Sequence, residues 1–223
     1  AGADNLVQKI LVSRGVSGAD AQEKFLNPSI KEYMPDPSVL HDMDDAARII
    51  ADSVLRGDKI AIYGDYDVDG ITSTAICIKC LRALGVDCIW HLPTREGEGY
   101  GLNAHAIDEI AAQGAKLLIT VDCGISGASD VAHARELGMR VVVTDHHSPD
   151  AVLPAADAVI DPKRTDDTSG LSYLAGVGVA FLTMVALRRE LKSRDLSDDM
   201  RARVNNLNLM NYLDLVALGT ICD

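Results

Sequence analysis

The stretch that decides the fold is KIAIYGDYDVDGITSTAICIKCLRALG, residues 59–85. It begins with an apolar run, continues through a short acidic segment, and ends with apolar residues at helical spacing. This order predicts a buried strand, a loop and a covering helix. The loop contains Asp65, Asp67 and Asp69 at alternate positions, and such close carboxylates repel one another unless solvent or a cation neutralises them. The stretch therefore indicates either a solvated acidic loop or a cation site.

The same alternation of apolar runs and helical segments continues along the chain. Expected strands lie within residues 59–64, 88–93, 116–123, 139–147 and 156–162, and expected helices within residues 71–85, 103–114, 126–138, 174–191 and 209–223. Such alternation is typical of βαβ units. Because the runs are almost continuously apolar, both faces of the sheet should be covered. The sequence predicts an α/β fold with a Rossmann-like, mostly parallel sheet and flanking helices.

Two regions are expected along the chain. Residues 1–56 have helical patterns interrupted by a proline-containing loop, and we expect them to form an amino-terminal helical segment that packs on the core. Residues 57–223 should form the α/β domain. The charged stretch 192–206 lies between two apolar helical segments of this domain.

Composition limits the classes of function. Hydrophobic residues make up 48% of the chain, which excludes a disordered protein. The net charge of −12 and the aromatic content of 4% argue against a chain that binds nucleic acid through a basic, aromatic-rich surface. The acidic excess indicates a solvated surface, part of which bound metal ions could neutralise. Five cysteines, mostly within apolar runs, suit free thiols in the cytoplasm, and no signal peptide or membrane span is expected.

Polar residues follow the expected strands. The acidic triplet follows the first strand and Asp122 the third, while Asp145, His146 and His147 follow the fourth. The carboxyl ends of parallel strands share one edge, so these groups should converge there. Carboxylates with imidazole suit Mn²⁺, or alternatively Mg²⁺, and two ions sharing one carboxylate would use all of these groups. Each aspartate alone could simply cap a helix, but the joint occurrence favours a metal site.

Several motifs resemble a known family. GDYDVDG, VDCGIS and TDHH are similar to the first three motifs of the DHH phosphoesterase superfamily. YGDYDVDGITSTA, EGYGLN, LAGVGVAF and LDLVALGTICD resemble its RecJ-like branch of single-strand-specific exonucleases. The resemblance runs from FLNPS to the final aspartate and implies a catalytic core that is truncated at Asp223, because members of this branch continue into further domains.

The resemblance also implies roles for individual residues. Asp122 would bridge two ions, with Asp67 on one of them and Asp65 as a further ligand or supporting catalytic group. Asp69, His146 and Asp223 would hold the other ion. His147 would face the scissile phosphate, and Asp145 would orient the histidines.

The implied function is metal-dependent 5′→3′ hydrolysis of single-stranded DNA to 5′-mononucleotides, in DNA repair and recombination. Single-stranded DNA would be the partner, with repair and single-strand-binding proteins as further candidates, and no membrane. Arg95, Gly176 and Gly178 are candidate substrate contacts, the glycines through helix-start amides that face a phosphate. The alternatives are a connecting loop for Arg95 and close helix packing for the two glycines.

Two other functions stay open. Tyr63 stands where the pyrophosphatase and oligoribonuclease branches have a histidine ligand, which weighs against those branches. A phosphodiesterase for short oligonucleotides or cyclic dinucleotides is one alternative. A non-catalytic nucleic-acid-binding scaffold with the same fold is the other.

Overall fold

A computed structural model describes residues 2–94 and 101–223. The chain divides into two units, Ala1–Asp36 and Pro37–Asp223. The first unit contains α1 (Gly2–Ser13), α2 (Ala19–Leu26) and α3 (Ile30–Tyr33). This division differs from the predicted boundary after residue 56, because α4 (Met43–Arg56) packs against helix and strand elements of the second unit.

The second unit holds a five-stranded sheet and its covering helices. The strands are β1 (Ile60–Tyr63), β2 (Cys88–His91), β3 (Leu117–Val121), β4 (Arg140–Thr144) and β5 (Ala158–Ile160). The helices, besides α4, are η1 (Pro37–Val39), α5 (Val68–Ala83), α6 (Ala104–Ala112), α7 (Ala128–Glu136), α8 (Gly176–Ser193), α9 (Asp198–Asn206), η2 (Leu209–Tyr212) and α10 (Leu213–Cys222).

All strand pairs are parallel, in the order β2-β1-β3-β4-β5. The predicted α/β class and parallel sheet are therefore confirmed. β2 and β3 lie on opposite sides of β1. The direction in which strands are added to the sheet therefore reverses at β1, and the switch point lies between β1 and β3. In open parallel sheets, this switch point leaves a crevice beyond the carboxyl ends of the two strands. Asp65 and Asp67 lie in the connection after β1, Asp69 lies in the first turn of α5, and Asp122 directly follows β3.

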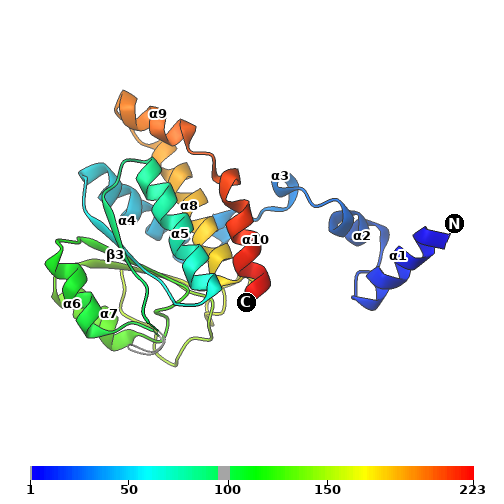
Figure 1. The fold of residues 1–223 in the computed structure, drawn as a ribbon, viewed down its shortest axis with the longest axis horizontal. Coiled ribbons are helices and arrows are strands. Elements are labelled where there is room, and N and C mark those ends of the chain that lie inside the picture. Colours follow the sequence, from blue (N-terminus) through cyan, green and yellow to red (C-terminus); the bar gives the residue numbers. More distant parts are fainter. Residues whose placement is uncertain (1, 95–100) are drawn as a thin grey trace. The chain divides into compact units, whose positions relative to one another are not determined.

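Side chains alternate between two cores along the central strands β1, β3 and β4, as the pleat requires. Ile60 and Ile62 of β1 belong to one core, with α4, α5 and α8, while Ala61 and Tyr63 belong to the other, with α6 and α7. Figure 1 shows the sheet between these two helical layers. Strands buried on both faces explain why their sequences read as unbroken apolar runs.

Two helices depart from their expected extents. α5 begins at Val68, because the Asp67 carboxylate accepts a hydrogen bond from the Gly70 amide and caps the first turn. α9 lies within the charged stretch 192–206, where no helix is expected, and it buries only Val204. No helix in the described ranges is both long and apolar enough to span a bilayer.

Candidate metal centre

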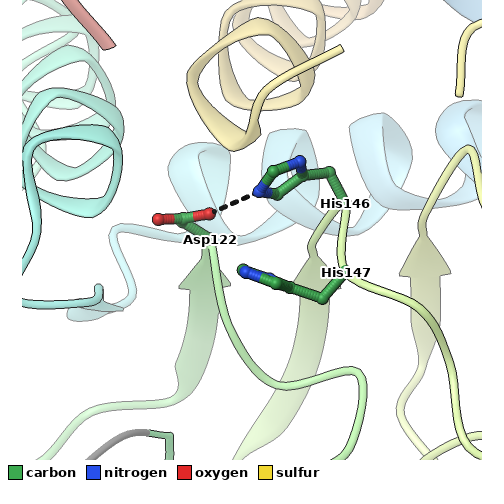
Figure 2. A group of neighbouring side chains, drawn as sticks. All are labelled: Asp122, His146 and His147. Carbon is green, nitrogen blue, oxygen red and sulfur yellow. Dashed lines mark ion pairs between the residues drawn. The ribbon is translucent and has the colours of Figure 1, made fainter. Parts of the chain in front are cut away.

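The candidate site lies at the switch point of the sheet, where the ends of β1, β3 and β4 meet. Asp122 directly follows β3 and donates its backbone N–H to the Thr144 carbonyl. Its φ of 60° lies in the left-handed region, which turns the chain away from the strand. Figure 2 shows Asp122 rising from the end of its strand toward His146 and His147, which come from the connection after the next strand.

Three groups of side chains have ligand atoms within 4.8 Å of one another. They are Asp122 with His146 and His147, Asp69 with His146 and Asp223, and Asp65 with Asp67 and Asp122. Asp122 and His146 each belong to two groups, so the three groups form one continuous cluster. The structure thus brings all six predicted metal ligands together, along with His147.

His146 links the first and second groups. Its Nε2 lies 3.1 Å from Asp122 Oδ1, 3.6 Å from Asp69 Oδ2 and 3.7 Å from Asp223 Oδ1. Apart from these contacts, neither Nε2 nor the two Asp122 oxygens has a hydrogen-bond partner among the described residues, although all three are buried. Unpartnered buried polar atoms are costly unless a ligand satisfies them. Oxygen and imidazole donors of this kind fit a divalent cation such as Mn²⁺.

The electrostatics of the cluster reflect this crowding. Burial raises the pKa of Asp122 to about 10, and the neighbouring carboxylates of Asp69 and Asp67 add to the shift. Burial also raises the pKa of Asp65, one of whose oxygens is buried without a hydrogen-bond partner in the described part of the chain. The site therefore attracts positive charge, since a cation would offset both the burial and the mutual repulsion.

Asp69 connects two helices at the site. Its carboxylate accepts hydrogen bonds from the backbone N–H groups of Gly176 (2.6 Å) and Val177 (2.8 Å) at the start of α8. Burial raises the pKa of Asp69, and these two amides oppose that shift. Asp67 caps α5, so helix capping and membership of the cluster hold together for both aspartates. The helix-capping and metal-binding interpretations of these aspartates therefore do not exclude each other.

Asp145 holds the histidine pair. Its Oδ1 accepts hydrogen bonds from His147 Nδ1 (2.8 Å) and the His146 amide (2.7 Å), and its Oδ2 accepts one from the Ile125 amide (2.9 Å). Burial alone would raise the pKa of Asp145, but these donors hold it below its ordinary value. The same hydrogen bond to Asp145 raises the pKa of His147. Asp145 thus fixes which nitrogen of His147 carries a proton and orients the ring.

The predicted substrate contacts fare differently. The Gly176 amide is bonded to Asp69 and the Gly178 amide to the Ala175 carbonyl, so each already has an acceptor. A phosphate contact through these two amides stays a prediction, and their existing hydrogen bonds do not favour it. Close packing explains Gly176, because a Cβ there would lie 2.5 Å from Asp122 Oδ1. Arg95 lies outside the described residues.

Two residues near the site were missed from the sequence. Asp161 follows β5, is fully buried, and has one oxygen bonded to the Lys163 amide and the other without a partner among the described residues. Burial raises its pKa to about 6. Its position after a strand is the signal that identified the other aspartates. Gly219 of α10 lies against Thr72 and Asp69, where a Cβ would come within 2.5 Å and 3.0 Å of their side chains.

Comparison with known proteins gives the family. Residues 59–220 match the model of the DHH family, N-terminal domain. The chain is 43% identical to the single-stranded-DNA-specific exonuclease RecJ of Salmonella typhimurium over 98% of its length. It is 38% identical, again over 98% of its length, to the RecJ of Bacillus subtilis. The chain spans only 37% and 25% of these relatives, respectively.

Solved structures agree with the sequence comparison. The crystal structure of an exonuclease RecJ bound to manganese superposes with a TM-score of 0.69 at 36% identity, over 82% of this chain and 43% of the other. RecJ from Thermus thermophilus in complex with Mn²⁺ gives a TM-score of 0.64 at 32% identity, over 82% of this chain and 24% of the other.

Proposed function

Because this chain belongs to the DHH family, we propose that it is the catalytic part of a RecJ-like exonuclease for single-stranded DNA. The proposed enzyme degrades DNA from the 5′ end, releases 5′-mononucleotides, and acts in DNA repair and recombination. The observation that carries the proposal is the sharing of Asp122 and His146 among three ligand groups. Similarity to exonucleases over almost the whole chain supports the choice of substrate.

Two divalent ions, Mn²⁺ or Mg²⁺, would occupy the cluster. Asp65, Asp67 and Asp122 would hold one ion, and Asp69, Asp122, His146 and Asp223 the other. When bound, such ions activate water as a nucleophile and neutralise charge on the attacking and leaving oxygens of a phosphodiester. The orphaned oxygens of Asp122 support its role as the shared ligand.

The remaining residues prepare the site for a phosphate. His147 stands beside Asp122 and His146, and the Asp145 carboxylate keeps its Nδ1 protonated and its ring oriented. The raised pKa of His147 favours the charged form, which suits contact with a negatively charged phosphate. Asp69 and Asp67 keep the starts of α8 and α5 against the cluster, so the ligand set is positioned before substrate arrives.

The test combines metal binding with hydrolysis. Calorimetric titration with Mn²⁺ should give two sites per chain, and the chain should then digest long 5′-phosphorylated single strands. Asp122→Asn should abolish both, whereas Asp150→Asn, at an exposed aspartate in the connection after β4, should change neither. Release from only very short or cyclic substrates would favour the oligonucleotide phosphodiesterase instead. Absence of Mn²⁺ binding would favour the non-catalytic scaffold.

A further inference from the structure

The connection between β5 and α8, residues 161–175, starts and ends beside the metal centre. At its start, Asp161 follows Ile160, whose carbonyl accepts a hydrogen bond of 3.0 Å from the Asp145 amide. At its end, the Gly176 amide binds Asp69. We call this segment the β5–α8 loop. Exposed side chains within a few residues of either end of this loop therefore lie near the metal centre.

The middle of the β5–α8 loop is anchored to His41 and Asp42, just before α4. Arg164 is 8% exposed and bonds to Asp42, Asp166 and the Val159 carbonyl. Further along, Asp167 accepts a hydrogen bond from the His41 amide. These anchors engage both acidic side chains in the middle of the loop. The exposed residues therefore project from a pre-organised backbone, which lowers the entropy lost when a ligand binds.

Lys163 is the exposed cation of this loop. The connections after the five strands, over their described residues, contain two lysines or arginines, Lys163 and Arg164. Arg164 is buried and neutralised by two carboxylates. Lys163 is exposed and forms no ion pair within the described ranges. Near a cluster of carboxylates, such a cation suits a phosphate of a bound nucleic-acid strand.

Tyr173 adds an aromatic face on the same loop. It is 74% exposed, in a chain with only 4% aromatic residues. It lies shortly before Gly176 in the sequence, so its Cα lies within about 11 Å of the backbone that touches Asp122 and Asp69. Exposed aromatic rings beside a strand-binding site stack on bases without regard to their identity.

We infer that the β5–α8 loop binds the substrate strand, with Lys163 paired to a backbone phosphate and Tyr173 stacked on a base. The inference rests on the proposed function, because it takes single-stranded DNA as the ligand. It assigns this chain a strand-binding surface despite its net charge of −12. The affinity of the loop combines a salt-dependent part, from the lysine, with a salt-independent part, from the tyrosine.

Fluorescence anisotropy with a short single-stranded oligonucleotide, in EDTA and at several salt concentrations, separates the two contributions. Lys163→Met should reduce the slope of log affinity against log salt by about 0.7, the value for one phosphate contact on a single strand. Tyr173→Ala should weaken binding roughly tenfold at every salt concentration, and Tyr173→Phe should retain wild-type affinity. Lys192→Met, at an exposed lysine in the last turn of α8, should change neither quantity. The KM for digestion in Mn²⁺ should follow the same order.

The outcomes distinguish the two proposals. If the wild type digests single strands but the Lys163 and Tyr173 variants keep its slope, affinity and KM, the inference is overturned and the exonuclease function stands. If the wild type neither binds nor digests single strands, both proposals fail. Both side chains are exposed, so Mn²⁺ binding by the variants should equal that of the wild type.

Discussion

Replacing Asp122 with asparagine should stabilise the metal-free protein while abolishing its affinity for divalent cations. Asparagine is the appropriate replacement because φ at this position is 60°, and asparagine tolerates the left-handed region better than alanine does. The substitution keeps the shape of the side chain and removes its ability to ionise. Any change in stability therefore reports the cost of the buried carboxyl group.

The size of the effect follows from the pKa of Asp122. Burial and neighbouring carboxylates raise it from 3.8 to about 10, so at pH 7 the carboxyl group must take up a proton when the chain folds. The gap of about 3 pH units between the ordinary pKa of 3.8 and pH 7 corresponds to roughly 4 kcal/mol of lost folding stability. The asparagine also buries amide N–H groups without partners, which costs about 1–3 kcal/mol and offsets part of this gain. The variant should gain on the order of 1–3 kcal/mol at pH 7.

The sign of the pH dependence is the sharper test. A carboxyl group with a raised folded pKa binds more protons in the folded state, so wild-type stability falls as pH rises from about 4 toward 10. Asparagine does not titrate, and the stability difference should widen by about 1.4 kcal/mol per pH unit. Urea unfolding in EDTA at several pH values measures it.

Asp42→Asn is the matched control, because Asp42 shares the φ of 60°. Its carboxylate lies 2.8 Å from the buried Arg164 guanidinium. This variant should lose about 1–3 kcal/mol, since a charged donor loses its partner. A difference between Asp122→Asn and wild type that is negative, or that stays constant with pH, would refute the reasoning. Mn²⁺ affinity equal to that of the wild type would refute the bridging role.

Three further substitutions test other contacts. Gly176→Ala should abolish Mn²⁺ binding in calorimetry and lower the stability of the fold by roughly 1–3 kcal/mol. The reason is that the new Cβ would lie 2.5 Å from Asp122 Oδ1. Gly178→Ala is the control, because the atoms nearest to its Cβ belong to the Leu174 side chain, at 3.2 Å and beyond. Asp145→Asn should lower the pKa of His147, measured by NMR titration, because their hydrogen bond raises it. Stabilisation from a raised histidine pKa is fully present at low pH, so this variant should lose most stability below about pH 6.5; an unchanged pKa would contradict the assigned contact. Asp161→Asn should be more stable than the wild type by up to about 3 kcal/mol at pH 7, measured by urea unfolding. Burial raises the pKa of Asp161 to about 6, so wild-type stability falls between about pH 4 and 6. A stability difference that is the same at pH 4 and pH 7 would contradict this assignment.

Much of the fold could be predicted because its central strands are buried on both faces. The runs around Ile62, Ile119 and Val142 are unbroken in apolar character, and they became β1, β3 and β4. α9 could not be predicted in this way, because only Val204 of that helix is buried and hydrophobic periodicity is absent. The boundary between the two units, after Asp36, could not be predicted from sequence patterns either. It depends on which core buries the apolar face of α4, and the sequence does not show this.

Convergence of the metal-site residues was predictable for a geometric reason, since the carboxyl ends of parallel strands share one edge. That argument needs only the strand order and the positions of Asp67, Asp122 and His146. The partners of backbone amides are a different matter. Nothing in the sequence AGVGVA shows that the start of α8 faces Asp69 and not a phosphate, because the contact spans more than a hundred residues of chain.

The fold and the candidate metal centre depend on the same close contacts, which couples stability to metal binding. A Cβ at Gly70, Gly176 or Gly219 would come within 2.5 Å of the acidic loop backbone, of Asp122 or of Thr72. α5, α8 and α10 therefore approach the carboxylates at backbone distance. The starts of α5 and α8 point at Asp67 and Asp69, where the helix dipoles offset part of the repulsion. Because the Asp122 carboxylate accepts no hydrogen bond from the described residues, divalent cations should complete the core. Mn²⁺ at a hundred times its Kd should add about 2.7 kcal/mol per site.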